Sequence, residues 1–70
     1  MKTRIYYKNM RFQAAPDSAT PEMQFRIIET GLKDPAGFAA VRLQYSDGGE
    51  EVAAVLCLED GIRNCGLKII

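Results

Sequence analysis

Apolar and polar residues alternate along much of this chain with the period of a β-strand. Successive side chains of a strand point to opposite faces, so this spacing places one face on a core and the other in water. The pattern repeats over residues 39–46. Its strictest stretch has apolar Met23, Phe25 and Ile27 between polar Glu22, Gln24 and Arg26.

Stretches rich in Pro, Gly, Asp and Ser divide the chain into candidate strands. Two prolines make residues 14–21 a loop, and Asp34-Pro35-Ala36-Gly37 is typical of a turn. Asp47-Gly48 favours the positive φ angles of a hairpin turn, and residues 59–61 predict a further turn. The predicted strands are residues 2–13, 22–32, 38–45, 51–58 and 62–70.

Residues 22–32 also carry helix signals. Thr20 could cap a helix, Pro21 suits the first helical position and Gly31 suits its end. Strict alternation and β-branched residues favour a strand instead, and periodicity is the stronger signal. The segment is therefore predicted as a strand, with a helix as the alternative.

The predicted fold is all-β: residues 1–70 form a single small domain, an antiparallel meander of four to five strands curled into a half-barrel. The alternative is an α+β fold with one helix over residues 21–31 on a four-stranded antiparallel sheet. The stretch from Val52 to Leu58 is apolar on both faces, which requires a covering layer. A helix, a curled sheet or a second copy could supply it, so we also expect a homodimer.

Composition limits the class of protein. The chain has 70 residues, 47% hydrophobic and 26% charged, which is too apolar for disorder. It lacks the run of about 18 apolar residues that a membrane span needs, so no membrane contact is expected. Residues 1–8 are charged before any apolar signal region could form, so we expect a cytoplasmic protein.

The charge is unevenly distributed, although the net charge is zero. Residues 1–33 hold six Lys and Arg against three Asp and Glu, and residues 34–70 hold three against six. This asymmetry is a hint about partners only.

Enzymatic and metal chemistry find little support. The chain has no histidine, the usual general base, so no enzyme is expected. Cys57 and Cys65 match no zinc spacing and are predicted to be thiols filling the core. The acidic residues near the turns are predicted to be solvated, and Gly48-Gly49 matches no phosphate-binding motif. No metal or cofactor is predicted.

One group of residues is a candidate binding surface. Basic residues neutralise phosphates and aromatic rings stack on bases, as in small β-barrels that bind single strands. The same alternation also suits an edge strand whose aromatics are core and whose basic groups remain in water. The candidates are Lys2, Arg4, Tyr6, Tyr7, Lys8, Arg11 and Phe12.

The leading function hypothesis is a non-enzymatic interaction protein, a small adaptor or inhibitor that binds a larger protein through a sheet edge, the residue 14–21 loop or a charged face. Stand-alone domains of this size are frequent among phage and mobile-element proteins. The alternative is a nucleic-acid-binding β-barrel that uses the basic aromatic N-terminal segment. An enzyme or small-molecule carrier is the least supported, because so short a chain seldom encloses a pocket of about 300 Å³.

Overall fold

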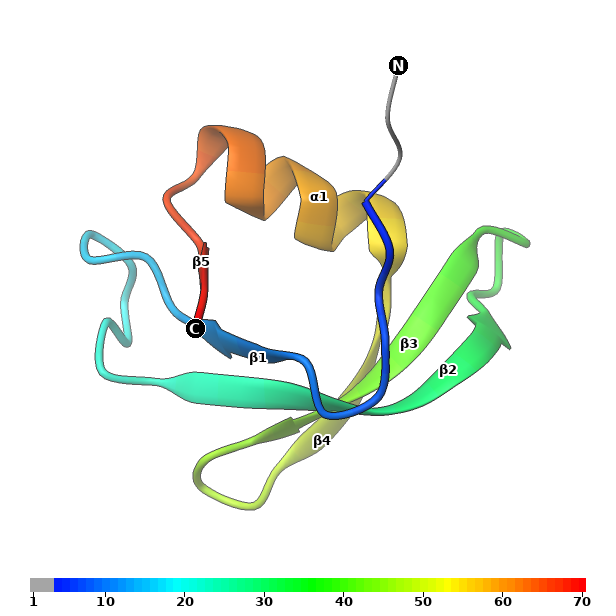
Figure 1. Cartoon of the computed structure of the whole chain (residues 1–70), viewed down its shortest axis with the longest axis horizontal. Helices are drawn as coiled ribbons and strands as arrows, with labels where there is room; N and C mark the ends of the chain where they lie inside the picture. The colour runs from blue at the N-terminus through cyan, green and yellow to red at the C-terminus, as the bar shows by residue number, and fades with distance from the viewer. Residues whose placement is uncertain (1–3) are drawn as a thin grey trace.

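The computed structural model describes residues 4–70 as a five-stranded antiparallel sheet with one helix (Figure 1). The sheet is curved and is not closed into a barrel. Its strand order is β4-β3-β2-β1-β5, so β4 and β5 form the two edges. The elements are β1 (Arg11–Gln13), β2 (Gln24–Lys33), β3 (Ala39–Tyr45), β4 (Glu50–Ala54), α1 (Val55–Asn64) and β5 (Lys68–Ile69).

The predicted antiparallel meander is confirmed. The strand predicted over residues 22–32 is β2, which begins at Gln24 and ends at Lys33, so the alternative helix over residues 21–31 is wrong. The turn at residues 34–37 has the Gly37 N–H donating to the Asp34 carbonyl at 2.9 Å. In the predicted hairpin, Gly48 has φ +93°, and the Tyr45 N–H donates to the Gly49 carbonyl at 2.7 Å.

The strand predicted over residues 2–13 is much shorter. Among residues 4–13 only Arg11–Gln13 is a strand. The chain reverses at Lys8 and Asn9, where Asn9 has φ 75° and its N–H donates to the Ile27 carbonyl at 2.7 Å. Asparagine tolerates this left-handed backbone better than most residues. The residues before the turn therefore leave the sheet and run toward the helix (Figure 1).

The strand predicted over residues 51–58 ends at Ala54, and helix α1 follows directly. In α1, the apolar residues Val55, Leu58 and Ile62 have helical spacing. Leu58 is buried, and Val55 and Ile62 pack against the core. The turn predicted at residues 59–61 is therefore wrong. Glycine suits position 61 of the helix because a Cβ there would lie 3.2 Å from Leu67 Cδ2, which is closer than ordinary van der Waals contact.

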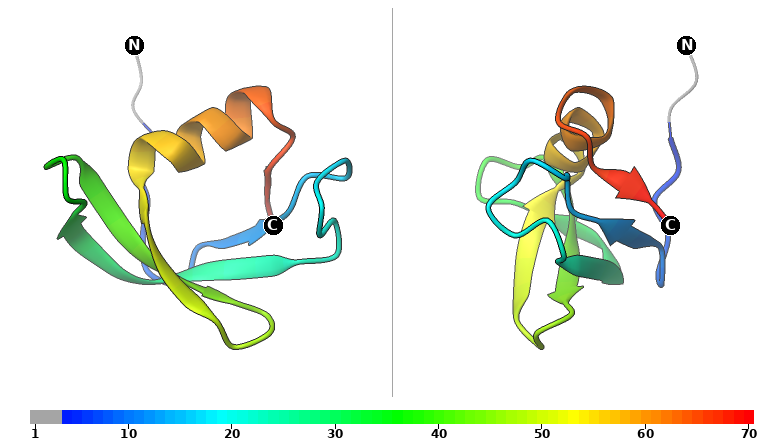
Figure 2. Two further views of the ribbon diagram at one scale, coloured as in Figure 1. Left: turned by 180° about the vertical axis from the view of Figure 1, so that it is seen from behind. Right: turned by 90° about the vertical axis from the view of Figure 1, so that its left-hand side faces the viewer.

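The helix covers one face of the sheet and supplies the layer that the apolar stretch requires. It packs against β3 and β4 (Figure 2). The strand predicted over residues 62–70 is reduced to β5, which pairs with β1. The core lies between helix and sheet and consists of Met10, Phe12, Ile27, Val41, Leu43 and Leu58.

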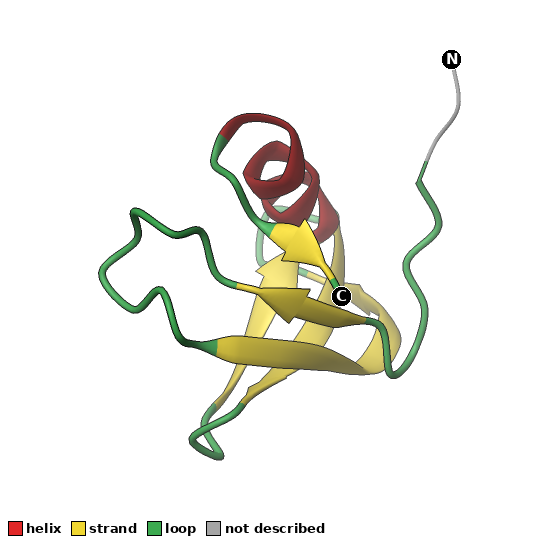
Figure 3. Cartoon of the chain, turned by 60° about the vertical axis from the view of Figure 1, so that its left-hand side comes forward, coloured by secondary structure: helices red, strands yellow, loops and turns green. Residues whose placement is uncertain are grey.

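The opposite face of the sheet, which we call the outer face, carries no helix in the part of the chain that the structure describes (Figure 3). Arg11 and Gln13 of β1 alternate with the buried Phe12, so they point to this outer face. Register places Arg26 opposite Arg11 and Gln44 opposite Arg26. Three neighbouring strands thus contribute polar side chains to one surface.

Candidate anion-binding site

Arg11 and Arg26 lie directly opposite each other on β1 and β2. Side chains at such paired positions have Cβ atoms about 4.5–5.5 Å apart, and like charges placed there repel. Among residues 4–70, neither arginine forms an ion pair with a carboxylate. The two positive charges therefore remain uncompensated by this part of the chain.

Amide oxygens hold both guanidinium groups in place. Arg26 donates to Gln44 Oε1 through Nε at 3.3 Å and through Nη2 at 3.0 Å, and to Asn9 Oδ1 through Nη1 at 3.1 Å. Arg11 Nη2 donates to Gln24 Oε1 at 3.1 Å. A neutral acceptor orients a guanidinium without cancelling its charge, so the site keeps its positive potential.

A shallow cleft of about 350 Å³ lies at these residues. Its lining residues come from β1, β2, the end of β3 and the β3–β4 turn, and they include both Arg11 and Arg26. We call it the guanidinium cleft. It is lined by Arg11, Gln24, Phe25, Arg26, Gln44, Tyr45, Ser46 and Gly48.

Arg42 gives an internal contrast on the same sheet. It precedes Gln44 by two residues on β3, and its Nε lies 3.0 Å from Glu29 Oε1. Glu50 on β4 is the cross-strand partner of Gln44 and carries a carboxylate. Within residues 4–70, Glu50 forms no ion pair with the cleft arginines. The sheet thus pairs one arginine and leaves two available.

The residues predicted as one binding surface are divided among several places. Arg11 alone lies in the guanidinium cleft. Phe12 is fully buried in the core, but the edge-strand interpretation of its segment is wrong, because β1 lies between β2 and β5. Tyr7 is 57% exposed and Lys8 lies exposed in the turn. Lys2 falls outside the described residues.

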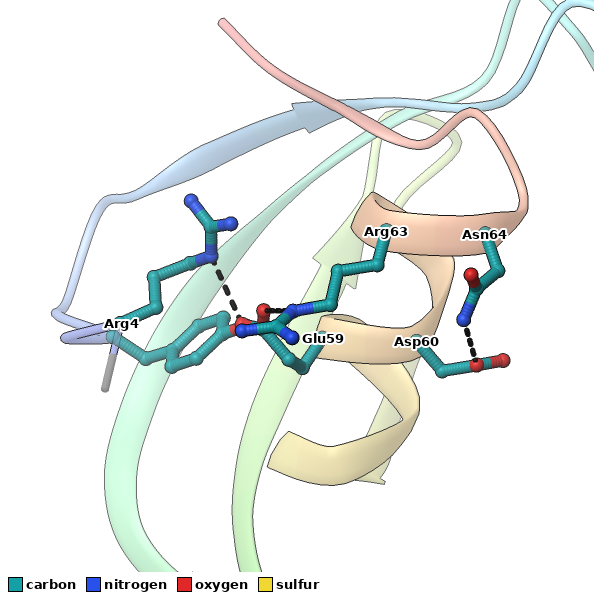
Figure 4. Close-up of polar contacts among 6 residues, drawn as sticks. Arg4, Glu59, Asp60, Arg63 and Asn64 are labelled. Carbon is teal, nitrogen blue, oxygen red and sulfur yellow. Dashed lines mark hydrogen bonds and ion pairs between the residues drawn. The ribbon is translucent and has the colours of Figure 1, made fainter. Parts of the chain in front are cut away.

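Arg4 and Tyr6 reach helix α1 instead. Arg4 Nε lies 2.9 Å from Glu59 Oε1, the Tyr6 hydroxyl donates to the same oxygen at 2.6 Å, and Arg63 contacts Glu59 Oε2 (Figure 4). Hydrogen bonds from Tyr6, Arg4 and Arg63 lower the pKa of Glu59 to about 2. Burial and the bond to Glu59 raise the pKa of Tyr6 to about 12. These contacts connect the segment that holds Arg4 and Tyr6 to helix α1.

The sequence interpretation missed Arg26, Gln24, Gln44 and Ser46. Alternation already placed Gln24 and Arg26 on the polar side of their strand, so a signal for an outward position existed. The pairing of Arg26 with Arg11 depends on register, which becomes visible only when the strands are assembled.

Both cysteines were predicted to fill the core, and this is wrong. Cys57 and Cys65 are exposed free thiols, because the segment that holds Cys57 is a helix whose core face is taken by Leu58. Among residues 4–70 no cluster of three His, Cys, Asp or Glu residues could hold a metal ion. Over the same residues, no helix has the length and apolar character needed to cross a membrane.

Comparisons with protein-family models, with curated proteins and with solved structures find no match to this chain.

Proposed function

We propose that this protein is a non-enzymatic interaction protein that binds an acidic segment of a partner protein at the guanidinium cleft. The observation that carries the proposal is the pair Arg11 and Arg26, which are opposed in register and whose guanidinium groups, within residues 4–70, are held only by amide oxygens. Charge-assisted bonds from arginine to carboxylate are about twice as strong as neutral ones. An incoming carboxylate would also relieve the repulsion between the two arginines.

The surroundings of the cleft suit an extended peptide. Gln13 and Gln24 lie beside each other on β1 and β2, and Lys68 of β5 is the register partner of Gln13. Gln13 Nε2 donates to the Pro21 and Met23 carbonyls, whereas Gln24 Nε2 uses one of its two N–H groups on Gln13 Oε1 and keeps the other for the backbone of an extended segment. Lys68 adds a third positive charge on the same face. A small adaptor or inhibitor could hold its target in this way.

Nucleic acid is the competing ligand class, since phosphates also bind arginine. Strand-binding barrels add exposed rings on which bases stack. Of the three aromatics predicted for that role, Phe12 is buried and the Tyr6 hydroxyl is bonded to Glu59. Among these three, Tyr7 alone has a mostly exposed ring, and it precedes the turn that leads to β1. The two half-buried rings that line the cleft, Phe25 and Tyr45, pack against each other, and Phe25 also stacks on Phe12. These positions favour a protein partner.

Fluorescence anisotropy with a labelled Asp- and Glu-rich peptide tests the proposal. We expect binding that weakens with added salt, falls by about tenfold or more in Arg11→Gln and in Arg26→Gln, and is retained in Arg42→Gln. Equal affinity in all four proteins would contradict it. So would tighter binding of single-stranded DNA or RNA at the same salt concentration.

The homodimer stays a prediction, as does the cytoplasmic location. Val52 on the edge strand β4 is 43% exposed and would be one apolar contact for a second copy. Light scattering that gives the monomer mass at micromolar concentration would contradict the dimer.

A further inference from the structure

The hydrogen-bond donors of the guanidinium cleft exceed what the chain uses. A guanidinium has five N–H donors in a fixed fork. The Arg11 guanidinium donates one hydrogen bond to residues 4–70, from Nη2 to Gln24 Oε1. Arg26 makes three contacts, to Gln44 and Asn9. Several N–H groups of both arginines therefore remain for a ligand with many acceptor oxygens.

The charge of the cleft also exceeds what one carboxylate supplies. Two guanidinium groups lie on directly opposed positions, and the three ion pairs found within residues 4–70 involve other arginines. A carboxylate brings one negative charge and two oxygens. A phosphate monoester brings a charge of about −1.5 to −2 and three acceptor oxygens. The second ligand matches both the charge and the donor count.

The cleft is organised before a ligand arrives. Gln44 and Asn9 fix the Arg26 fork from two sides, and the Asn9 backbone is itself bonded to β2 at Ile27. Gln24, which accepts from Arg11, donates in turn to Gln13 Oε1 at 2.9 Å. Side chains that are already ordered lose less conformational entropy on binding. The geometry therefore favours a small, highly charged group over a diffuse acidic surface.

We propose that the guanidinium cleft is a site for a phosphate monoester dianion carried on a phosphorylated side chain of the partner protein. This inference rests on the proposed function, since it names the anchor of the same acidic segment. A phosphodiester of nucleic acid carries a single charge per group and matches the opposed pair less well.

Titration calorimetry with three matched peptides tests the inference: one with phosphoserine, one with glutamate and one with serine at the same position of an acidic segment. We expect the phosphoserine peptide to bind about tenfold or more tightly than the glutamate peptide. Arg11→Gln and Arg26→Gln should each reduce that advantage, Arg26→Lys should restore part of it, and Arg42→Gln should leave it unchanged. Circular dichroism of each variant reports whether it is folded.

The pH dependence provides a second, independent readout. The chain has no histidine, and guanidinium groups stay protonated throughout. The second pKa of a phosphate monoester is about 6, so the dianion fraction falls about fourfold between about pH 7.5 and pH 5.5. We expect affinity for the phosphoserine peptide to fall accordingly while that for the glutamate peptide stays level.

The outcomes separate the two proposals. Equal affinity for the phosphoserine and glutamate peptides would overturn the phosphate anchor and leave the acidic-segment function standing. Absence of binding by all three peptides would overturn both. Tighter binding of single-stranded DNA than of the phosphoserine peptide, with no loss at the lower pH, would replace both with a nucleic-acid ligand.

Discussion

Arg11 and Arg26 face each other across neighbouring strands without a carboxylate partner in residues 4–70, while Arg42 on the next strand is paired with Glu29. Opposed like charges lower the stability of a sheet. A fold that needed only stability would gain from a glutamine at either position. A bound anion would offset the repulsion between Arg11 and Arg26, which gives the arrangement a functional reason.

The first prediction concerns the loss of stability caused by the opposed arginines. Arg11→Gln removes the repulsion and loses one exposed hydrogen bond to Gln24. We expect its free energy of unfolding in urea to equal or exceed that of the unsubstituted protein at low salt. Arg42→Gln, which loses an exposed ion pair, should cost about 0–1 kcal/mol. A loss of more than about 1 kcal/mol in Arg11→Gln would show that Arg11 has a structural role.

The sheet could be predicted because its signals are local. Strict alternation over residues 22–27 and the Asp47-Gly48 turn each favour one backbone conformation, and the structure has both. The helix signals at Thr20, Pro21 and Gly31 were misleading, because Gly31 instead has φ 78° where the register of β2 and β3 shifts. A glycine at positive φ serves a bulge as well as a helix end.

Helix α1 was missed because its local signals conflict. The apolar stretch before it continues from β4 without a break, the N-cap residue Ala54 makes no side-chain capping bond, and Gly61 resembles a turn residue. The helix forms because Leu58, Val55 and Ile62 pack against the core in that conformation. The cleft could be predicted only in part for a different reason: Arg11 was found, but its pairing with Arg26 on β2 depends on the register of the assembled strands.

A second prediction concerns the stability of the protein at low pH. Glu59 has its pKa lowered to about 2 in the folded protein, from 4.5. A lowered folded pKa contributes stability that is present above about pH 4.5 and is lost as the pH falls toward 2. We expect Glu59→Gln to lower Tm at neutral pH and to lose little further stability across that range. Thermal unfolding at several pH values measures both.

The control for this prediction is Glu22→Gln, an exposed residue that forms no ion pair within residues 4–70. It should follow the unsubstituted protein at every pH. If Glu59→Gln showed the same acid sensitivity as that protein, the contact of Glu59 with Arg4 and Tyr6 would contribute nothing to stability.

A third prediction tests the packing of the helix. Leu58 is 5% exposed and lies in the core, whereas Leu56 is 62% exposed on the same helix. Leu58→Ala should lower the free energy of unfolding by about 2–5 kcal/mol through lost burial and a cavity. Leu56→Ala should change it by about 0.5 kcal/mol or less. Denaturant unfolding distinguishes them, and similar losses in both would contradict the orientation of α1.

A fourth prediction concerns the thiols. Cys57 and Cys65 are both exposed, so each should react with Ellman's reagent in the native protein. Addition of denaturant should release no further thiol. A thiol that reacts only after unfolding would show that the residue is buried, and the Cys57→Ser and Cys65→Ser variants would identify it.

NMR spectroscopy can map where the phosphoserine peptide binds. Amide chemical shifts of isotope-labelled protein are followed by NMR during titration with the phosphoserine peptide. The proposed function predicts perturbations that concentrate on β1, the first half of β2 and the end of β3, around Arg11, Arg26 and Gln44, with α1 unchanged. Perturbations confined to α1 or to the β4 edge, with the guanidinium cleft unaffected, would contradict it.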